Sequence, residues 1–374
     1  TVIFEVGTGA ASNQRIGSGD AGGKRATISG GSLNTTTSTH ATIGGGSNNY
    51  ASSSYTTISG GKNNTSKNLY ATIGGGLNNT ASGKDSTIGG GNISVASGLG
   101  STISGGVSNT ASGDYSTIGG GTGNISSGNT STLGGGYGNK SYGQESFVGG
   151  GRYNQATAVQ TTISGGYNNI VDKTGSTIGG GNSNKASGYT AIGNSTIGGG
   201  INNTALGNDG FVGGGNNNDA TGYYSATIGG GKNNTSGNSF TTVSGGQGNT
   251  TTGQGSVVGG INNTASGLYG YATIGGGLNN VATGNYSVVS GGLSNQSSAV
   301  ASTIAGGRSC VASGVQSFVG GGKTNKADAL NSSVLGGESN NTNLQTNSHI
   351  IGSLIIADRS DCAFVNNLSI KSIP

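Results

Sequence analysis

A single aliphatic residue, surrounded by small and polar residues, recurs at a fixed interval along almost the whole chain. The interval is 15 residues over the first half, and after a four-residue insertion it continues in steps of 15 or 16. A unit this short cannot bury an apolar face by itself, so it must stack on its neighbours. The pattern therefore predicts an all-β fold, a parallel β-solenoid (β-roll) of about 22 short coils. The recurring positions are Ile28, Ile43, Ile58, Ile73, Ile88, Ile103, Ile118, Leu133, Val148, Ile163, Ile178, Ile197, Val212, Ile228, Val243, Val258, Ile274, Val289, Ile304, Val319, Leu335 and Ile351.

The repeat divides the chain into three segments. Residues 1–25 are an N-terminal strand and a lead-in rich in small residues, and residues 26–346 form the repeat domain. Residues 347–374 are denser in aliphatic residues and regain charge. Terminal repeats are usually atypical, so we expect this last segment to be a cap or a junction to a following module.

Three short stretches refine this division. Residues 1–4 with Val6 predict a short strand, and Ile16-Gly17 resembles a degenerate first coil. Ala191-Ile192-Gly193 lies in the insertion and looks like an abbreviated extra coil or a bulged loop.

The coil around Ile73 illustrates the other repeated positions. Since β-branched residues favour strands, the aliphatic position predicts an extended segment of about four or five residues with its side chain inside the coil. Gly75 belongs to a column that is glycine in all but the last coil, which indicates a positive φ or a backbone too close for any Cβ. Ala81 suits the narrow inside of a second strand, and Gly83 closes the turn. We therefore expect two strands per coil.

Asn79 represents an asparagine column six places after the aliphatic position, present in 18 of the 22 coils. One explanation is a corner in the left-handed conformation, which Asn tolerates. The other is a ladder of stacked side-chain amides that runs along the solenoid. Both explanations give the column a structural role.

The residue before the aliphatic position is threonine in most coils. Alternation along a strand places it on the face opposite the aliphatic side chain. A face that met only water would need nothing but Thr or Ser, yet Phe147, Phe211 and Phe318 occupy the column. We therefore predict that these three residues lie in a chain–chain interface of a homo-oligomer.

Aromatic residues mark one corner of the coil, 12 places after the aliphatic position. On a neutral surface rich in Asn, Ser and Thr, such rings are typical of a glycan-contact edge, where one ring face stacks on a sugar. The alternative is that the rings cover seams between coils or chains. The residues of this edge are Tyr55, Tyr70, Tyr115, Tyr224, Phe240 and Tyr286, with Tyr189, Tyr223, Tyr269 and Tyr271 near the same corner.

Composition excludes several classes of protein. The 83 glycines follow the 15-residue period rather than every third position, which excludes a collagen helix. Charged residues are 7% of the chain and the net charge is +4, so we expect no nucleic-acid partner. No apolar run reaches the roughly 18 residues of a membrane span, so we expect no direct membrane insertion.

Catalysis requires convergent titratable groups, and the sequence brings few together. The two histidines, His40 and His349, lie near opposite ends of the chain. Carboxylates at one outer corner are at least two coils apart, about 10 Å at a strand spacing of about 4.8 Å. Calcium-binding solenoids need an Asp in each repeat, where this chain has Asn, Ser or Thr. We therefore expect no enzyme activity, no metal and no cofactor.

The repeat is similar to the head repeats of YadA-like trimeric adhesins. The resemblance is carried by Ser86-Thr87-Ile88-Gly89 with Ala96-Ser97-Gly98, and again by Ser116-Thr117-Ile118-Gly119. It covers residues 26–351 and implies a left-handed parallel β-roll, three chains side by side, and a role in attachment. The Gly-Gly-Gly run and the asparagine column depart from that family, so no binding residue is carried over.

The ends show a second, shorter resemblance to the flanks of such rolls in phage tail-fibre proteins. It rests on Phe4-Glu5-Val6-Gly7-Thr8-Gly9 and on Ala357-Asp358-Arg359-Ser360-Asp361-Cys362 through Ile373-Pro374.

Together these features predict a structural or attachment protein that is extracellular. The first hypothesis is a rigid homotrimeric segment, a rod, of a viral (phage) tail fibre that presents a cell-surface-binding edge to a glycan or protein receptor. The alternative is a bacterial trimeric surface adhesin or extracellular filament. Beside other copies of itself, its partners would be other virion or surface-fibre proteins. A third hypothesis, an ice-binding solenoid, follows from the threonine column but is weakened by the phenylalanines that interrupt it.

Overall fold

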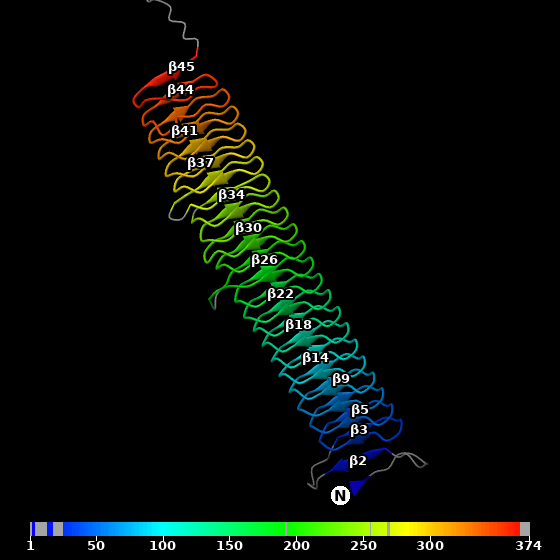
Figure 1. Ribbon diagram of the computed structural model, residues 1–374. Coiled ribbons are helices and arrows are strands. Elements are labelled where there is room, and N and C mark those ends of the chain that lie inside the picture. Colours follow the sequence, from blue (N-terminus) through cyan, green and yellow to red (C-terminus); the bar gives the residue numbers. More distant parts are fainter. Residues whose placement is uncertain are drawn as a thin grey trace, which may run out of the picture. The chain divides into compact units, whose positions relative to one another are not determined.

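The computed structural model describes residues 2–3, 13–17, 25–190, 193–254, 256–267 and 270–366. It divides into two units, Thr1–Asn184 and Lys185–Pro374. Strands are the only regular elements in these described ranges, and no helix occurs in them. Within each unit, successive coils stack with their strands side by side (Figure 1). The predicted all-β parallel solenoid of about 22 coils is confirmed. Phe4, Val6, Ala191, Ile192 and Tyr269 lie outside the described residues.

The first unit contains β1 to β23. Its aliphatic strands are β3 (Thr27–Ile28), β5 (Thr42–Ile43), β7 (Thr57–Ile58), β9 (Thr72–Ile73), β11 (Thr87–Ile88), β13 (Thr102–Ile103), β15 (Thr117–Ile118), β17 (Thr132–Leu133), β19 (Phe147–Val148), β21 (Thr162–Ile163) and β23 (Thr177–Ile178). The other strands are β1 (Val2–Ile3), β2 (Gln14–Gly17), β4 (Thr35–Thr36), β6 (Tyr50–Ala51), β8 (Thr65–Ser66), β10 (Thr80–Ala81), β12 (Val95–Ala96), β14 (Thr110–Ala111), β16 (Ile125–Ser126), β18 (Lys140–Ser141), β20 (Gln155–Ala156) and β22 (Ile170–Val171).

The second unit contains β24 to β45. Its aliphatic strands are β25 (Thr196–Ile197), β27 (Phe211–Val212), β29 (Thr227–Ile228), β31 (Thr242–Val243), β33 (Val257–Val258), β35 (Thr273–Ile274), β37 (Val288–Val289), β39 (Thr303–Ile304), β41 (Phe318–Val319), β43 (Ser333–Val334), β44 (His349–Ile351) and β45 (Ala363–Val365). The other strands are β24 (Lys185–Ala186), β26 (Thr204–Ala205), β28 (Asp219–Ala220), β30 (Thr235–Ser236), β32 (Thr250–Thr251), β34 (Thr264–Ala265), β36 (Val281–Ala282), β38 (Gln296–Ser297), β40 (Val311–Ala312) and β42 (Lys326–Ala327).

Most described coils carry two strands of two residues, and β44 and β45 have three residues each, so the expected strand length of four or five residues is wrong. Within each unit, the strands of neighbouring coils pair in parallel with their equivalents, as in Ile73 with Ile88 and Ala81 with Ala96. A third ladder of isolated bridges passes through Lys62 and Leu77, four places after the aliphatic position. The chain must bend between all three ladders within 15 residues, which leaves no room for longer strands.

The N-terminal lead-in joins the solenoid in a different register from the one expected. β2 pairs in parallel with β4, with Gln14 opposite Thr35, and β1 pairs antiparallel with β2. Ile16 is therefore not the equivalent of an aliphatic position, because β2 continues the ladder of second strands. Asn13 belongs to the asparagine column, since its side-chain oxygen accepts a hydrogen bond from the Asn34 backbone N–H at 3.0 Å.

The last two aliphatic positions were predicted one residue too late. Val334 pairs with Val319 and with Ile350, and both Val334 and Ile350 are fully buried. Leu335 and Ile351 face outward, with exposed fractions of 51% and 47%. Each of these coils has two adjacent aliphatic residues, and a slip of one residue exchanges the two faces of a strand. The ladder continues through β45, so the described part of residues 347–374 adds coils.

The inside of a coil is filled by one aliphatic residue and several small ones. Ile73, Ala71 and Ala81 are fully buried, and so is Asn79. At the position of Ala71 other coils have Ser or Thr, for example Ser86, whose hydroxyl donates to the carbonyl oxygen of Gly83 at 2.7 Å. Gly83 is buried against the next coil, where a Cβ would collide with the carbonyl oxygen of Gly98. The narrow coil thus selects small residues at these positions.

The asparagine column forms a buried amide ladder, which decides between the two explanations. The Asn79 side-chain amide donates to the carbonyl oxygens of Gly75 at 3.0 Å and Gly91 at 2.9 Å. Its backbone N–H donates to the side-chain oxygen of Asn64 at 3.0 Å, and this pattern recurs along both units. The left-handed corner falls one residue earlier, at Asn78, whose φ is 58°.

The close approach predicted for Gly75 occurs at its neighbour instead. Gly76 has a φ of +92°, and a Cβ there would collide with the carbonyl oxygen of Gly91 and lie 2.6 Å from the Asn79 amide nitrogen. At Gly75 the φ of +158° is nearly extended, and a Cβ would meet nothing within 4 Å. The structure therefore requires glycine at Gly76. Contacts within the single chain do not explain why the position of Gly75 is glycine in almost every coil.

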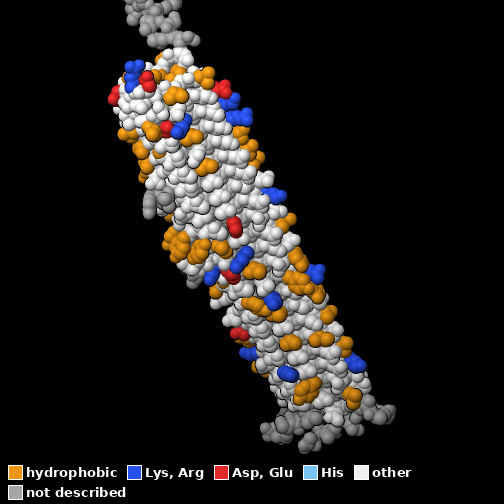
Figure 2. Space-filling view, viewed as in Figure 1, with side chains coloured by type: hydrophobic (Ala, Val, Ile, Leu, Met, Phe, Trp, Pro, Cys, Tyr) orange, Lys and Arg blue, Asp and Glu red, His pale blue; other side chains and the backbone are white. Residues whose placement is uncertain are grey.

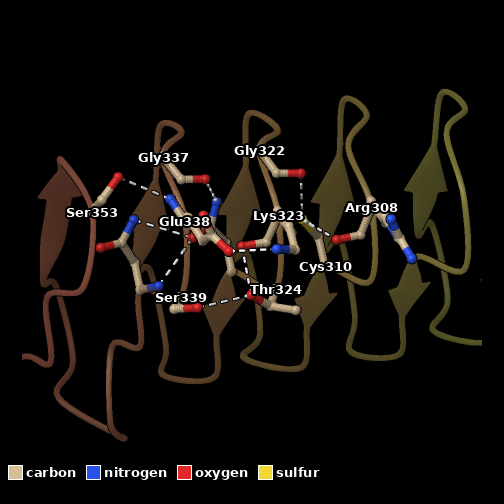
Figure 3. A network of polar contacts seen from close by, with 11 residues as sticks. Arg308, Cys310, Gly322, Lys323, Thr324, Gly337, Glu338, Ser339 and Ser353 are labelled. Carbon is tan, nitrogen blue, oxygen red and sulfur yellow. Dashed lines mark hydrogen bonds and ion pairs between the residues drawn. The ribbon is translucent and has the colours of Figure 1, made fainter.

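Two coils interrupt the amide ladder. Ser94 takes the asparagine position in one, and its buried hydroxyl has no hydrogen-bond partner. Cys310 takes it in the other, where its sulfur lies 3.6 Å from the Gly322 carbonyl oxygen (Figure 3). The backbone N–H of each residue still donates to the side-chain oxygen of the asparagine one coil earlier, which is Asn79 for Ser94 and Asn295 for Cys310. Only the side-chain part of the ladder is lost.

Candidate contact surfaces

The aromatic edge of the first unit lies on a corner with left-handed backbone. Tyr55, Tyr70 and Tyr115 have φ angles of 57–59° and are 47%, 49% and 60% exposed. The ring of Tyr55 stacks between His40 at 4.7 Å and Tyr70 at 5.2 Å. The rings of Tyr55 and Tyr70 thus contact each other across the seam between coils, and about half of their surface remains free.

A larger aromatic group lies at the corresponding corner of the second unit. Tyr224 and Phe240 are stacked with ring centres 6.1 Å apart, and Tyr189 is stacked on Tyr223 at 5.5 Å. An edge contact of 4.5 Å between Tyr223 and Tyr224 joins the two pairs. On the visible face, Figure 2 shows exposed hydrophobic side chains gathered in groups rather than spread evenly.

The last residue of the predicted edge, Tyr286, is 57% exposed with its ring centre 6.3 Å from Tyr271. All six residues are therefore at the surface. Five of them contact an aromatic ring on the coil before or after, which is what the seam-covering alternative requires. The sixth, Tyr115, has no aromatic partner among the described residues.

The phenylalanines of the threonine column are also at the surface of the single chain. Phe147 on β19 and Phe211 on β27 are each 41% exposed, and Phe318 on β41 is half-buried. Their neighbours in the ladder are threonine or serine, such as Thr132 and Thr162 beside Phe147 and Ser333 beside Phe318. Each ring thus projects from a strand face that is otherwise short and polar.

The sequence analysis missed a cluster around Arg152, at the bridge ladder on another corner. The Arg152 guanidinium carbon lies 5.2 Å from the ring centre of Tyr137, 5.0 Å from Tyr153 and 6.0 Å from Tyr167. A hydrogen bond to Tyr153 raises the pKa of Arg152, and the same bond lowers the pKa of Tyr153. The signal was present in the sequence, because Tyr137, Arg152 and Tyr167 are 15 residues apart.

Some of the remaining charged groups make structural contacts. Although partial burial alone would raise the pKa of Asp328, bonds from the Leu344 backbone, Lys326 and the Thr342 hydroxyl together lower it. In the second unit Lys323 and Glu338 form an ion pair of 2.6 Å between coils, drawn in Figure 3. Within the described ranges no group of three or more His, Cys, Asp or Glu side chains is placed to hold a metal ion. No helix of the described chain could span a membrane.

Comparison of the chain with models of protein families gives no match, and a search of curated proteins gives none either. The parallel β-solenoid of about 22 coils is consistent with a β-roll repeat. The likeness to YadA-like heads thus rests on the repeat signature and on this fold.

Proposed function

We propose that the chain is a structural attachment protein, a segment of a homotrimeric extracellular fibre of the phage tail-fibre kind that presents a surface for cell binding. A fold built from identical stacked coils fits a fibre-like structural protein. Its chemistry would be recognition and mechanical support rather than catalysis. The bacterial trimeric adhesin remains the alternative, and the same assembly would serve both.

The observation that carries the proposal is the apolar surface that one chain leaves uncovered on its threonine face. The exposed rings of Phe147 and Phe211 interrupt the threonine column. If this face of the chain met only water, threonine would suffice at every position. Burying apolar surface contributes about 25 cal/mol per Å², so a second copy that covers these rings would stabilise the assembly. Exposed aromatic rings that recur on one strand face are what a chain–chain interface along that face would cover.

The glycine column represented by Gly90 gives independent support. A Cβ at Gly90 would meet nothing within 4 Å, and no left-handed φ is required there. Glycine in an extended segment costs about 0.5–1 kcal/mol relative to alanine. Its recurrence in coil after coil, at a position with free space, is explained if another chain approaches the backbone there.

The test compares two adjacent glycines by light scattering and thermal unfolding. Gly90→Ala should leave the coil intact and weaken the oligomer, because its methyl group would enter the space of the partner chain. Gly91→Ala should unfold the coil itself, since its φ is +100° and a Cβ would collide with the Gly106 carbonyl oxygen.

The wild-type chain should have a molar mass near three times 35.9 kDa and should resist detergent until heated. A wild-type monomer, with Gly90→Ala as stable as or more stable than wild type, would refute the proposal. In that case a stand-alone solenoid such as an ice binder would be the better account of the threonine column.

A further inference from the structure

Arg152 is held between aromatic rings from three consecutive coils. Tyr137 precedes it by one coil and Tyr167 follows by one, and both pair with it in the bridge ladder. Tyr153 is the next residue, with a left-handed φ of 57° that turns its ring toward the guanidinium. The three rings are 47%, 37% and 45% exposed, in chain order. The cluster is therefore an ordered surface feature built from the repeat itself.

The positive charge of Arg152 has no carboxylate partner among the described residues. Its contacts are the three ring faces and the Tyr153 hydroxyl. Glu145, in the preceding coil, bonds instead to Gln160 at 2.9 Å on the left-handed corner of the aromatic edge. Lys140 lies on β18, in a different ladder, and is 5.8 Å from the ring of Tyr142. The Arg152 cluster by itself thus combines unpaired positive charge with aromatic surface.

This combination recognises a particular chemistry. A guanidinium offers a planar fork of N–H donors that matches a carboxylate or sulfate with two parallel bonds. Rings that already restrain the guanidinium reduce the side-chain entropy lost on binding. Exposed tyrosine rings supply apolar faces and hydroxyl groups, which suit a sugar ring beside the anion.

We propose that Arg152, Tyr137, Tyr153 and Tyr167 form a binding site for an acidic saccharide, with the guanidinium on its carboxylate or sulfate. The choice of a saccharide as the carrier of the anion rests on the proposed attachment function. The anion site itself does not depend on that function, because one chain supplies all four of its residues. The site is separate from the predicted aromatic edge, which has no arginine.

Isothermal titration calorimetry with the whole chain tests the site at low and at physiological salt. The probes are tetragalacturonate, its methyl ester, a chondroitin sulfate tetrasaccharide and sodium sulfate. The ester keeps the sugar ring and removes the charge, and sodium sulfate keeps the charge and removes the sugar. We expect binding of at least one acidic oligosaccharide, weakened by salt, and far weaker binding of the ester and of free sulfate.

The variant Arg152→Gln should weaken that binding about 10- to 100-fold, as expected for loss of a charge-assisted bond. Arg152→Lys should keep part of it, because lysine retains the charge but not the fork. The matched control is Arg308→Gln, in the same ladder position but between Leu293 and Lys323 rather than between rings (Figure 3). It should bind as wild type does.

Equal binding by Arg152→Gln and wild type would overturn the inference, as would binding of the ester or of free sulfate as tight as that of the acids. Absence of binding by both acidic oligosaccharides would overturn it too. The molar mass of the wild-type chain separates this result from the proposed function. A wild-type trimer that binds no acid refutes only this site, and a wild-type monomer that binds acid refutes only the fibre.

Discussion

Removing one amide from the buried ladder should open the solenoid locally. In Asn64→Ala, the Asn79 backbone N–H loses its acceptor, and the carbonyl oxygens of Gly60 and Gly76 lose the donor that lay 3.1 and 2.9 Å away. Gly76 keeps the backbone N–H of Lys62, so one buried N–H and one carbonyl are left without their bond. At about 1 kcal/mol per net bond and 1–3 kcal/mol for a buried orphan, the cost is about 3–5 kcal/mol.

The charge variant Asn64→Asp adds a pH signature. One carboxylate oxygen can still accept from Asn79, but the other would face the two carbonyl oxygens of Gly60 and Gly76. Burial and these oxygens raise the folded-state pKa of the new carboxyl above its unfolded value of about 3.9. The variant is then protonated in both states at low pH, and its stability falls as the pH rises through and above that unfolded value.

Native-state hydrogen exchange is the appropriate assay, because coils of a solenoid open locally rather than all at once. Amides of the coils on either side of Asn64 should exchange about 100-fold faster or more in Asn64→Ala, and distant coils should be unchanged. The control is Asn78→Asp at the exposed left-handed corner, which Asp tolerates. Equal protection in Asn64→Ala and this control would refute the role of the ladder.

Two further predictions concern buried polar groups. Ser94→Asn and Cys310→Asn should each raise stability by about 1–2 kcal/mol, because an amide at these buried positions restores the missing ladder bonds. Thermal unfolding checks this. A loss of stability would mean that these coils cannot accept the larger side chain. Ser116→Ala should be neutral or stabilising, since the buried Ser116 hydroxyl has no hydrogen-bond partner. Ser86→Ala should cost about 1 kcal/mol, because the Ser86 hydroxyl donates to the Gly83 carbonyl oxygen. Equal effects of the two changes would contradict this distinction.

The fold was predictable because a single feature, the 15-residue aliphatic period, fixes the stacking. A residue such as Ile73 must pair with its equivalents Ile58 and Ile88, and the parallel ladders then follow. The register failed at Leu335, where an adjacent aliphatic residue satisfied the pattern equally well. Only the pairing of whole strands distinguishes Val334 from its neighbour.

The structural roles of single columns were less predictable, because adjacent positions in the repeat can take either role. The left-handed conformation assigned as one alternative to Asn79 occurs at Asn78, and the close approach assigned to Gly75 occurs at Gly76. Each is a shift of one residue. In the glycine run, composition does not show which glycine makes the close contact, and the corner at Asn78 is occupied by residues as different as Ile93, so residue type does not indicate its conformation. The Arg152 cluster was missed because its four residues come from three coils and have no motif within any one of them.

The amide ladder and the glycine run act as one device. The Asn79 amide reaches the Gly91 carbonyl oxygen only because Gly76 has no side chain where the two coils meet. Backbone and amide groups thereby satisfy each other inside the coil, and a chain with 7% charged residues needs few surface ion pairs to remain ordered. Constraint is concentrated inside, and the left-handed corners are left free to vary.

Those corners accept residues as different as Tyr70, Asp85 and Ile93, all with φ between 56° and 59°. A non-glycine residue in this conformation costs about 1 kcal/mol or more, so each one requires a compensating contact. At Tyr70 the compensation is a stack on Tyr55, and at Tyr153 it is the guanidinium of Arg152. Because these contacts lie at the surface, the same side chains that stabilise the solenoid define the surfaces it offers to a ligand.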